Sequence, residues 1–232
     1  NPKPIRDFSL VLMKAVAESA GKKRFTLVLG GDCSILIGIM PALKLKGRYG
    51  LIFLDAHADF YDPANSISGE VADMDLAIVT GQGPEILTNI HNLKPYVKEA
   101  DVIHAGQRDQ EETKKYGARD IRDTAIKCFS LADIQKKGVS KVATEVLKHI
   151  NTLQTEGFWI HFDTDVLADD INPAVDYRLA GGLQFKETEE LIRGLLLTGK
   201  IAGMSITIYN PKLDADGGIA RNIVSSMGRA FP

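Results

Sequence analysis

The stretch Leu51-Ile52-Phe53-Leu54-Asp55-Ala56-His57-Ala58-Asp59 decides the fold, because a short apolar run stops there in three side chains of the kind that bind metals. In an extended backbone successive side chains point to opposite faces, so Asp55, His57 and Asp59 would project together. Two carboxylates and an imidazole suit a divalent ion such as Mn²⁺, Fe²⁺ or Zn²⁺. The alternative interpretation is a polar loop that follows a buried strand.

Two more apolar runs end in polar side chains. Residues 25–29 lead into Gly30-Gly31-Asp32-Cys33-Ser34, and residues 158–162 lead into Asp163-Thr164-Asp165. Ligands collect at the carboxyl ends of parallel strands, so these clusters should meet near Asp55. Clustered buried carboxylates repel one another unless cations neutralise them. Two metal ions would resolve this conflict, and paired ions that activate water indicate a hydrolase.

Strand-like and helix-like runs alternate along the rest of the chain. This alternation predicts an α/β fold, with a mostly parallel central sheet covered by helices on both faces, and a single domain over residues 1–232. The expected strands are 25–29, 51–54, 101–106, 125–129, 158–162 and 204–209, and the expected helices are 5–20, 35–45, 74–80, 85–93, 109–116, 139–153, 187–197 and 219–227.

Composition excludes several classes of function. With 44% hydrophobic residues, 25% charged residues and a net charge of −2, the 232-residue chain lacks the basic cluster of a nucleic-acid-binding protein. It has neither an apolar run long enough for a membrane span nor a signal peptide, so we expect a soluble protein. Cys33 and Cys128 are too few for a disulfide framework, which favours a cytoplasmic setting. The chain does not begin with Met, and we expect that an N-terminal portion precedes it.

Three motifs together resemble a known family. Gly30-Gly31-Asp32-Cys33-Ser34, Asp55-Ala56-His57-Ala58-Asp59 and Phe162-Asp163-Thr164-Asp165 resemble, in this order, the signatures of the ureohydrolases: arginase, agmatinase, formimidoylglutamase and their relatives. The resemblance covers the chain from about Phe25 onward. It implies a three-layer α/β/α sandwich that acts on a small molecule and assembles as a homo-oligomer, a trimer or a hexamer.

The resemblance also implies roles for individual residues. Two divalent ions, Mn²⁺ in the first place, would be bridged by Asp55 and Asp163, and the bridging hydroxide would attack a guanidinium or amidine carbon with Asp59 orienting it. His161 shares the parity of Asp163 and is a candidate for proton transfer, or a satisfied strand histidine. The proposed metal ligands are Cys33, Asp55, His57, Asp59, Asp163 and Asp165, and the proposed substrate contacts are Ser68, Glu70 and Asp73, whose alternative is a set of solvated loop residues.

Three positions depart from the family pattern. Cys33 stands where the family has a histidine ligand, and a softer thiolate would favour Zn²⁺ or Fe²⁺. The alternative is a small buried thiol beside a weak or missing metal. Ala72 and Ile208 replace a proton-shuttling histidine and a guanidinium-binding glutamate. We therefore predict a binuclear hydrolase of a linear guanidino or formimidoyl compound; the alternatives are a catalytically silent binding or assembly subunit and a mononuclear zinc hydrolase.

Overall fold

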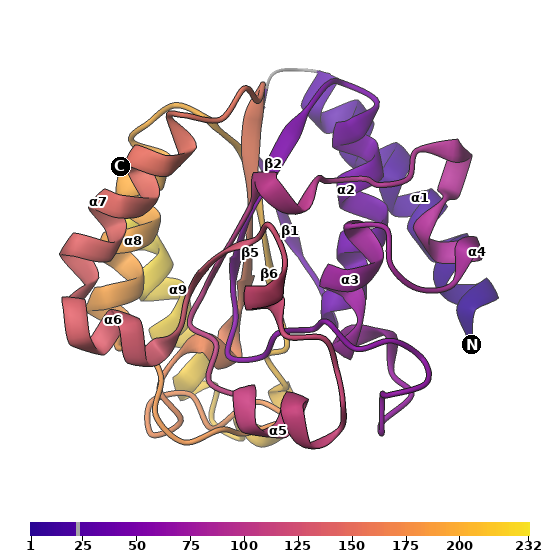
Figure 1. The fold of residues 1–232 in the computed structure, drawn as a ribbon. Coiled ribbons are helices and arrows are strands. Elements are labelled where there is room, and N and C mark those ends of the chain that lie inside the picture. The colour runs from indigo at the N-terminus through magenta and orange to yellow at the C-terminus, as the bar shows by residue number, and fades with distance from the viewer. Residues whose placement is uncertain (22–23) are drawn as a thin grey trace.

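The computed structural model describes residues 1–21 and 24–232, whose centre is a six-stranded sheet (Figure 1). All neighbouring strands in it are parallel, in the order β1-β6-β5-β2-β3-β4. Parallel neighbours need long crossovers, which the intervening helices supply. The strands are β1 (Thr26–Leu29), β2 (Tyr49–Leu54), β3 (Val102–Ala105), β4 (Lys127–Phe129), β5 (Gly157–Asp163) and β6 (Ile201–Thr207).

Helices cover both faces of the sheet, which confirms the three-layer α/β/α prediction (Figure 1). Helices α1 to α4 lie on one face and α6 to α9 on the other, while α5 lies at one end of the strands. Their bounds are α1 (Pro2–Gly21), α2 (Leu36–Lys44), α3 (Asp75–Val79), α4 (Glu85–Thr88), α5 (Gln110–Lys115), α6 (Leu131–Lys137), α7 (Val139–Ile150), α8 (Phe185–Leu196) and α9 (Gly218–Ala230).

The two central strands are buried on both faces, as their unbroken apolar runs predict. Along β2, Leu51 and Phe53 pack in the core beneath α1 to α4, whereas Ile52 and Leu54 pack in the core beneath α7 to α9. Trp159 of β5 is fully buried in the first of these cores. Because Asp55 and Asp163 have the parity of Phe53 and Trp159, this alternation carries them to the α1 to α4 side of the sheet.

Several element boundaries differ from the predictions. The last strand runs over Ile201–Thr207 and stops before Ile208, which adopts a left-handed φ of 67°. The expected helix 85–93 breaks after α4, since His91 and Asn92 also have positive φ. Helix α6 was not expected; a capping box between Ser130 and Asp133 starts it. In residues 1–21 and 24–232, no helix is both long and apolar enough to cross a membrane.

Candidate metal centre

The candidate site lies where the strand order changes direction. From the centre of the sheet, β2, β3 and β4 follow one another toward one edge, while β5, β6 and β1 lie toward the other. Open parallel sheets bind ligands at such a switch point, beyond the carboxyl ends of the strands. Leu54 pairs with Phe162 in the last register step of β2 and β5, so Asp55 and Asp163 follow side by side.

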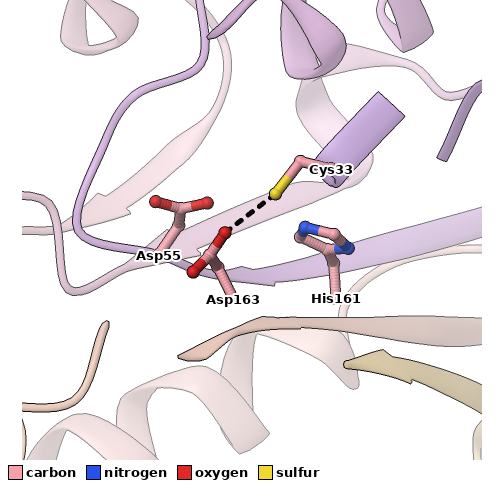
Figure 2. Close-up of side chains that lie close together, drawn as sticks. All are labelled: Cys33, Asp55, His161 and Asp163. Carbon is pink, nitrogen blue, oxygen red and sulfur yellow. Dashed lines mark hydrogen bonds between the residues drawn. The ribbon is translucent and has the colours of Figure 1, made fainter. Parts of the chain in front are cut away.

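The segment after β1 brings a thiol to the same place. The carboxylate of Asp32 accepts a hydrogen bond from the backbone N–H of Ser34 at 2.8 Å and caps the 3-10 helix Cys33–Ile35. Gly30 leaves room for the side chain of Ile35, because a Cβ there would lie 2.3 Å from Cδ1 of Ile35. The buried Cys33 Sγ–H then donates to Oδ2 of Asp163 at 2.8 Å (Figure 2).

Two groups of side chains are arranged so that each could hold a metal ion. The first, which we call the Cys33 cluster, converges from three segments, and all of its members are buried (Figure 2). In each group the potential ligand atoms lie within 4.8 Å of one another, and Asp55 belongs to both. The Cys33 cluster is Cys33, Asp55, His161 and Asp163; the second group, the His57 cluster, is Asp55, His57 and Asp165.

Electrostatics make these clusters receptive to a cation. Burial and the repulsion of Asp165 raise the pKa of Asp55 to about 7, and burial with the neighbouring acids also raises the pKa of Asp163. Among the described residues, Oδ2 of Asp55 is buried without a hydrogen-bond partner. Buried carboxylates with oxygens to spare fit a divalent ion, which would neutralise them and occupy those oxygens.

The histidines of the two clusters differ in their surroundings. Burial opposes the charged form of His57, but Asp165, whose Oδ2 lies 2.8 Å from its Nδ1, and Asp55 outweigh burial and raise its pKa. Burial lowers the pKa of His161 to about 3, so this imidazole is neutral. A neutral imidazole is the form that binds metals. His161 also lies in one cluster with Asp163, on the side of the sheet that its parity predicted.

Asp59 is the predicted ligand that stands apart. It is buried, adopts a left-handed φ of 45° and lines the cleft described below, yet neither cluster in the described part of the chain includes it. Asp75 lies near it and is fully buried. Burial and Asp55 raise the pKa of Asp75. The role of Asp59 as a ligand stays a prediction.

A cleft of about 910 Å³ opens above the clusters and contains the predicted substrate contacts. Ser68 Oγ donates to Oδ2 of Asp73 at 2.5 Å, and Tyr177 Oη donates to Oε2 of Glu70 at 3.0 Å. All four side chains line the cleft, as does Ile208. The structure thus brings Ser68, Glu70 and Asp73 to the same cleft as the clusters, while their contact with a substrate stays a prediction.

Sequence reasoning missed two residues that support the site. After β3, Nη2 of Arg108 donates to the backbone carbonyls of Asp165, Leu167 and Leu179 at 2.9, 3.3 and 3.2 Å. Oδ2 of Asp109 accepts from the N–H of Ala58 at 3.0 Å. The signal was present, because both residues follow a strand at the same sheet edge, but the sequence analysis assigned Asp109 to the start of a helix.

Fold and site together define an α/β/α domain with two candidate clusters of metal ligands, and comparisons with known proteins place it. Residues 4–231 match the Arginase family, so the chain belongs to the arginase family. It is 32% identical over 228 residues to the arginase of Staphylococcus aureus strain COL, covering 98% of this chain and 74% of that relative.

Solved structures agree with this assignment. The crystal structure of arginase from Bacillus cereus matches with a TM-score of 0.90 and 29% identity, covering 100% of this chain and 79% of that one. The arginase from Bacillus caldovelox matches with a TM-score of 0.90 and 31% identity, covering 100% of this chain and 76% of that one. This confirms the predicted family and fold, and with them a hydrolase.

Proposed function

We propose that this chain is a two-metal hydrolase that acts on a linear guanidino or formimidoyl compound. The observation that carries the proposal is the pair of ligand clusters that share Asp55 at the base of an acid-lined cleft. Membership of the arginase family supports it, since the relatives compared above are arginases. We also propose that residues 1–232 work as one catalytic domain.

The donor atoms indicate which residues would hold the ions. Asp55, which belongs to both clusters, and Asp163 would hold the ions, and the oxygen-rich His57 cluster suits Mn²⁺, whereas the thiol of the Cys33 cluster shifts the preference toward Zn²⁺ or Fe²⁺. When bound, the ions would lower the pKa of a water molecule and polarise the substrate. The ligand set that we propose is Cys33, Asp55, His57, Asp59, Asp163 and Asp165.

Charge in the cleft supports a cationic substrate. The guanidinium of Arg178 at the rim is already paired with Asp169, its Nε lying 2.6 Å from Oδ1. A concave surface rich in carboxylates concentrates cations, and a guanidinium or amidinium group is such a cation. The acids that line the cleft are Asp32, Asp59, Glu70, Asp73, Asp109, Glu112, Asp163, Asp165 and Asp176.

The outer cleft would select the substrate. An aliphatic side chain at Ile208 cannot form the paired hydrogen bonds that a carboxylate offers to a guanidinium. We therefore propose that Glu70 and Asp73, with the hydroxyl of Ser68, supply polar contacts to the substrate. We further propose that Asp59 and His161 act at the reacting centre, Asp59 by orienting the attacking water and His161 from its place beside Asp163. This arrangement favours a compound other than arginine.

One observation favours a second candidate, a catalytically silent binding or assembly subunit. Ile208 and Ala72 both line the cleft, at the positions where the family resemblance leads us to expect a glutamate and a histidine. Under this alternative the chain would keep the fold, hold no ions, and release neither urea nor formamide from any compound. The two candidates therefore differ in metal content as well as in turnover.

Metal analysis followed by a substrate panel tests the proposal. The chain is purified, stripped of metal, reconstituted with Mn²⁺, Zn²⁺ or Fe²⁺, and assayed with arginine, agmatine, guanidinobutyrate, guanidinopropionate and formimidoylglutamate for urea or formamide. We expect about two ions per chain. Asp55→Asn should lose ions and activity, whereas Asp101→Asn, a matched change of a buried acid just before β3, should keep both. Absence of bound ions under every condition would overturn the proposal.

We also propose a cytoplasmic homo-oligomer. Cys33 and Cys128 are both free thiols, which supports a reducing compartment. Leu27 and Leu29 on the edge strand β1 are 48% and 75% exposed, and such an apolar edge favours burial against another subunit. Light scattering on a size-exclusion column should give the mass of a trimer or a hexamer, and a monomer at micromolar concentration would contradict the proposed assembly.

A further inference from the structure

The imidazole of His161 occupies the side of the Cys33 cluster that faces β6. Sγ of Cys33 and Nε2 of His161 each lie 3.4 Å from the hydroxyl of Thr207, so the two atoms meet beside this hydroxyl although they come from different segments. The four potential ligand atoms, one each from Cys33, Asp55, His161 and Asp163, lie within 4.8 Å of one another (Figure 2). Ligand atoms around a tetrahedral Zn²⁺ are about 3 to 4 Å apart, so small side-chain shifts would close this group around an ion.

The far side of the imidazole is fixed by its neighbours. Nδ1 of His161 lies 2.9 Å from Oγ of Ser205, and the indole N–H of Trp159 donates to the same hydroxyl at 3.0 Å. The ring of Phe53 stacks on the imidazole with centroids 4.8 Å apart. With its proton on Nδ1, His161 donates to Ser205 and keeps the Nε2 lone pair free on the side of Thr207, where the sulfur of Cys33 and the two carboxylates lie within 4.8 Å. Metal-binding histidines are commonly oriented by such a hydrogen bond from the other ring nitrogen.

We infer that His161 is a direct metal ligand and that, with Cys33, it makes one of the two metal sites selective for a softer ion. This inference rests on the proposed two-metal function. A sulfur, an imidazole nitrogen and two carboxylate oxygens form a four-coordinate set that suits Zn²⁺ or Co²⁺ better than Mn²⁺. The His57 cluster offers one imidazole and two carboxylates and has no sulfur. The two sites of this chain therefore differ in the metal that they prefer.

A cobalt titration of the full chain tests the inference without an activity assay. Co²⁺ replaces Zn²⁺ in four-coordinate sites, and its absorption reports both the geometry and a bound thiolate. We expect a thiolate-to-cobalt charge-transfer band in the wild type, and we expect Cys33→Ser to abolish it. Mn²⁺ should displace Co²⁺ from this site only at a large excess, whereas it should compete at the second site.

His161→Asn is the informative variant. The asparagine amide can keep the hydrogen bond to Ser205, but it has no atom at the position of Nε2. If His161 only positioned the site, asparagine would therefore largely preserve metal binding. We expect Co²⁺ affinity at the thiolate site to fall by more than about 100-fold, beyond the 10- to 100-fold loss that is typical of supporting residues. His104→Asn is the matched control, because His104 is equally buried and packs beside Phe53 at 5.1 Å. Its Nε2 contacts the carbonyl of His57, and the charge-transfer band should persist.

The outcomes separate this inference from the proposed function. If no ion binds to the chain, the proposed function fails as a whole. If two ions bind but His161→Asn keeps the affinity and spectrum of the wild type, only the role of His161 is overturned. Should His161→Asn not fold, zinc-edge X-ray absorption of the wild type decides: sulfur with imidazoles from both His57 and His161 supports the inference, and a single imidazole per two ions overturns it.

Discussion

The buried carboxylate of Asp55 should make the metal-free protein less stable as pH rises from about 5 to 8, and Asp55→Asn should remove this dependence. Burial and Asp165 raise the pKa of Asp55 from 3.8 to about 7. The folded state then holds a proton that the unfolded state releases above pH 4, so the free energy of unfolding falls as pH rises toward 7. Between pH 5 and pH 7 this loss is about 2 kcal/mol, because the slope of about 1.4 kcal/mol for each pH unit halves as the pH reaches the folded-state pKa.

Comparison with the variant measures the contribution of Asp55 together with its effect on Asp59, Asp75 and Asp163, whose pKa values its charge helps to raise. Burial lowers the pKa of His104 to about 4 and that of His161 to about 3, so both stabilise the folded state as pH rises to 6.5. These effects are common to wild type and Asp55→Asn and cancel in the difference. Asp165, whose pKa is lowered by His57, titrates below this range. From pH 5 to pH 8, the variant should therefore gain about 3 kcal/mol relative to the wild type.

Thermal unfolding in the presence of a chelator measures the effect. For a chain of this length, about 3 kcal/mol corresponds to a shift of about 5 to 10 °C in the melting temperature of the variant relative to the wild type. Adding Zn²⁺ at pH 8 should restore the wild type by about 3 kcal/mol at a hundredfold excess over the dissociation constant, and should help Asp55→Asn far less. An equal difference between the two proteins at pH 5 and pH 8 would refute the reasoning.

Three other substitutions test the surroundings of the site. Arg108→Met leaves the carbonyl of Asp165 and its neighbours without their donor and should lower the free energy of unfolding by about 2 to 3 kcal/mol in a urea titration; an unchanged midpoint would contradict it. Gly106→Ala places a Cβ 2.8 Å from the carbonyl oxygen of Asp55 at a φ of 113°. The free energy of unfolding should fall by at least about 2 kcal/mol, and the melting temperature and the metal affinity should fall with it. Tyr177→Phe removes the hydrogen bond to Glu70 and should raise KM by about 2- to 10-fold with little change in the melting temperature; a large loss of stability would instead indicate a structural role.

The central strands and their polar ends were predictable because local chemistry determines them. Apolar runs that are buried on both faces predicted β2 and β5, and the abrupt change to Asp55 and Asp163 predicted the edge at which ligands meet. Parity alone placed His161 on the face of Asp163. These inferences use only the period of a strand and the rule that parallel strands bind ligands at their carboxyl ends.

Long-range contacts were not predictable in the same way. Arg108 supports three carbonyls of segments distant in sequence, and although its place after a strand was a signal, nothing local indicates these partners. The end of β6 was misplaced because Met204 to Tyr209 continues an apolar pattern, while Ile208 leaves the strand to donate its N–H to the carbonyl of Gly31 at 3.0 Å. Tertiary hydrogen bonding overrode the local preference of a β-branched residue for the strand.

Backbone strain and carboxylate repulsion at this edge of the sheet argue for metal binding rather than for an inert scaffold. Left-handed backbone at Ile208 costs about 1 to 2 kcal/mol, and Asp59 carries a similar strain. The buried carboxylates of Asp55 and Asp163 add repulsion that apolar side chains of equal volume would remove. A binding or assembly subunit without metal gains nothing from either cost. Two divalent ions would offset the repulsion outright, and the strained backbone at Asp59 and Ile208 would then serve to hold side chains around the cleft above them.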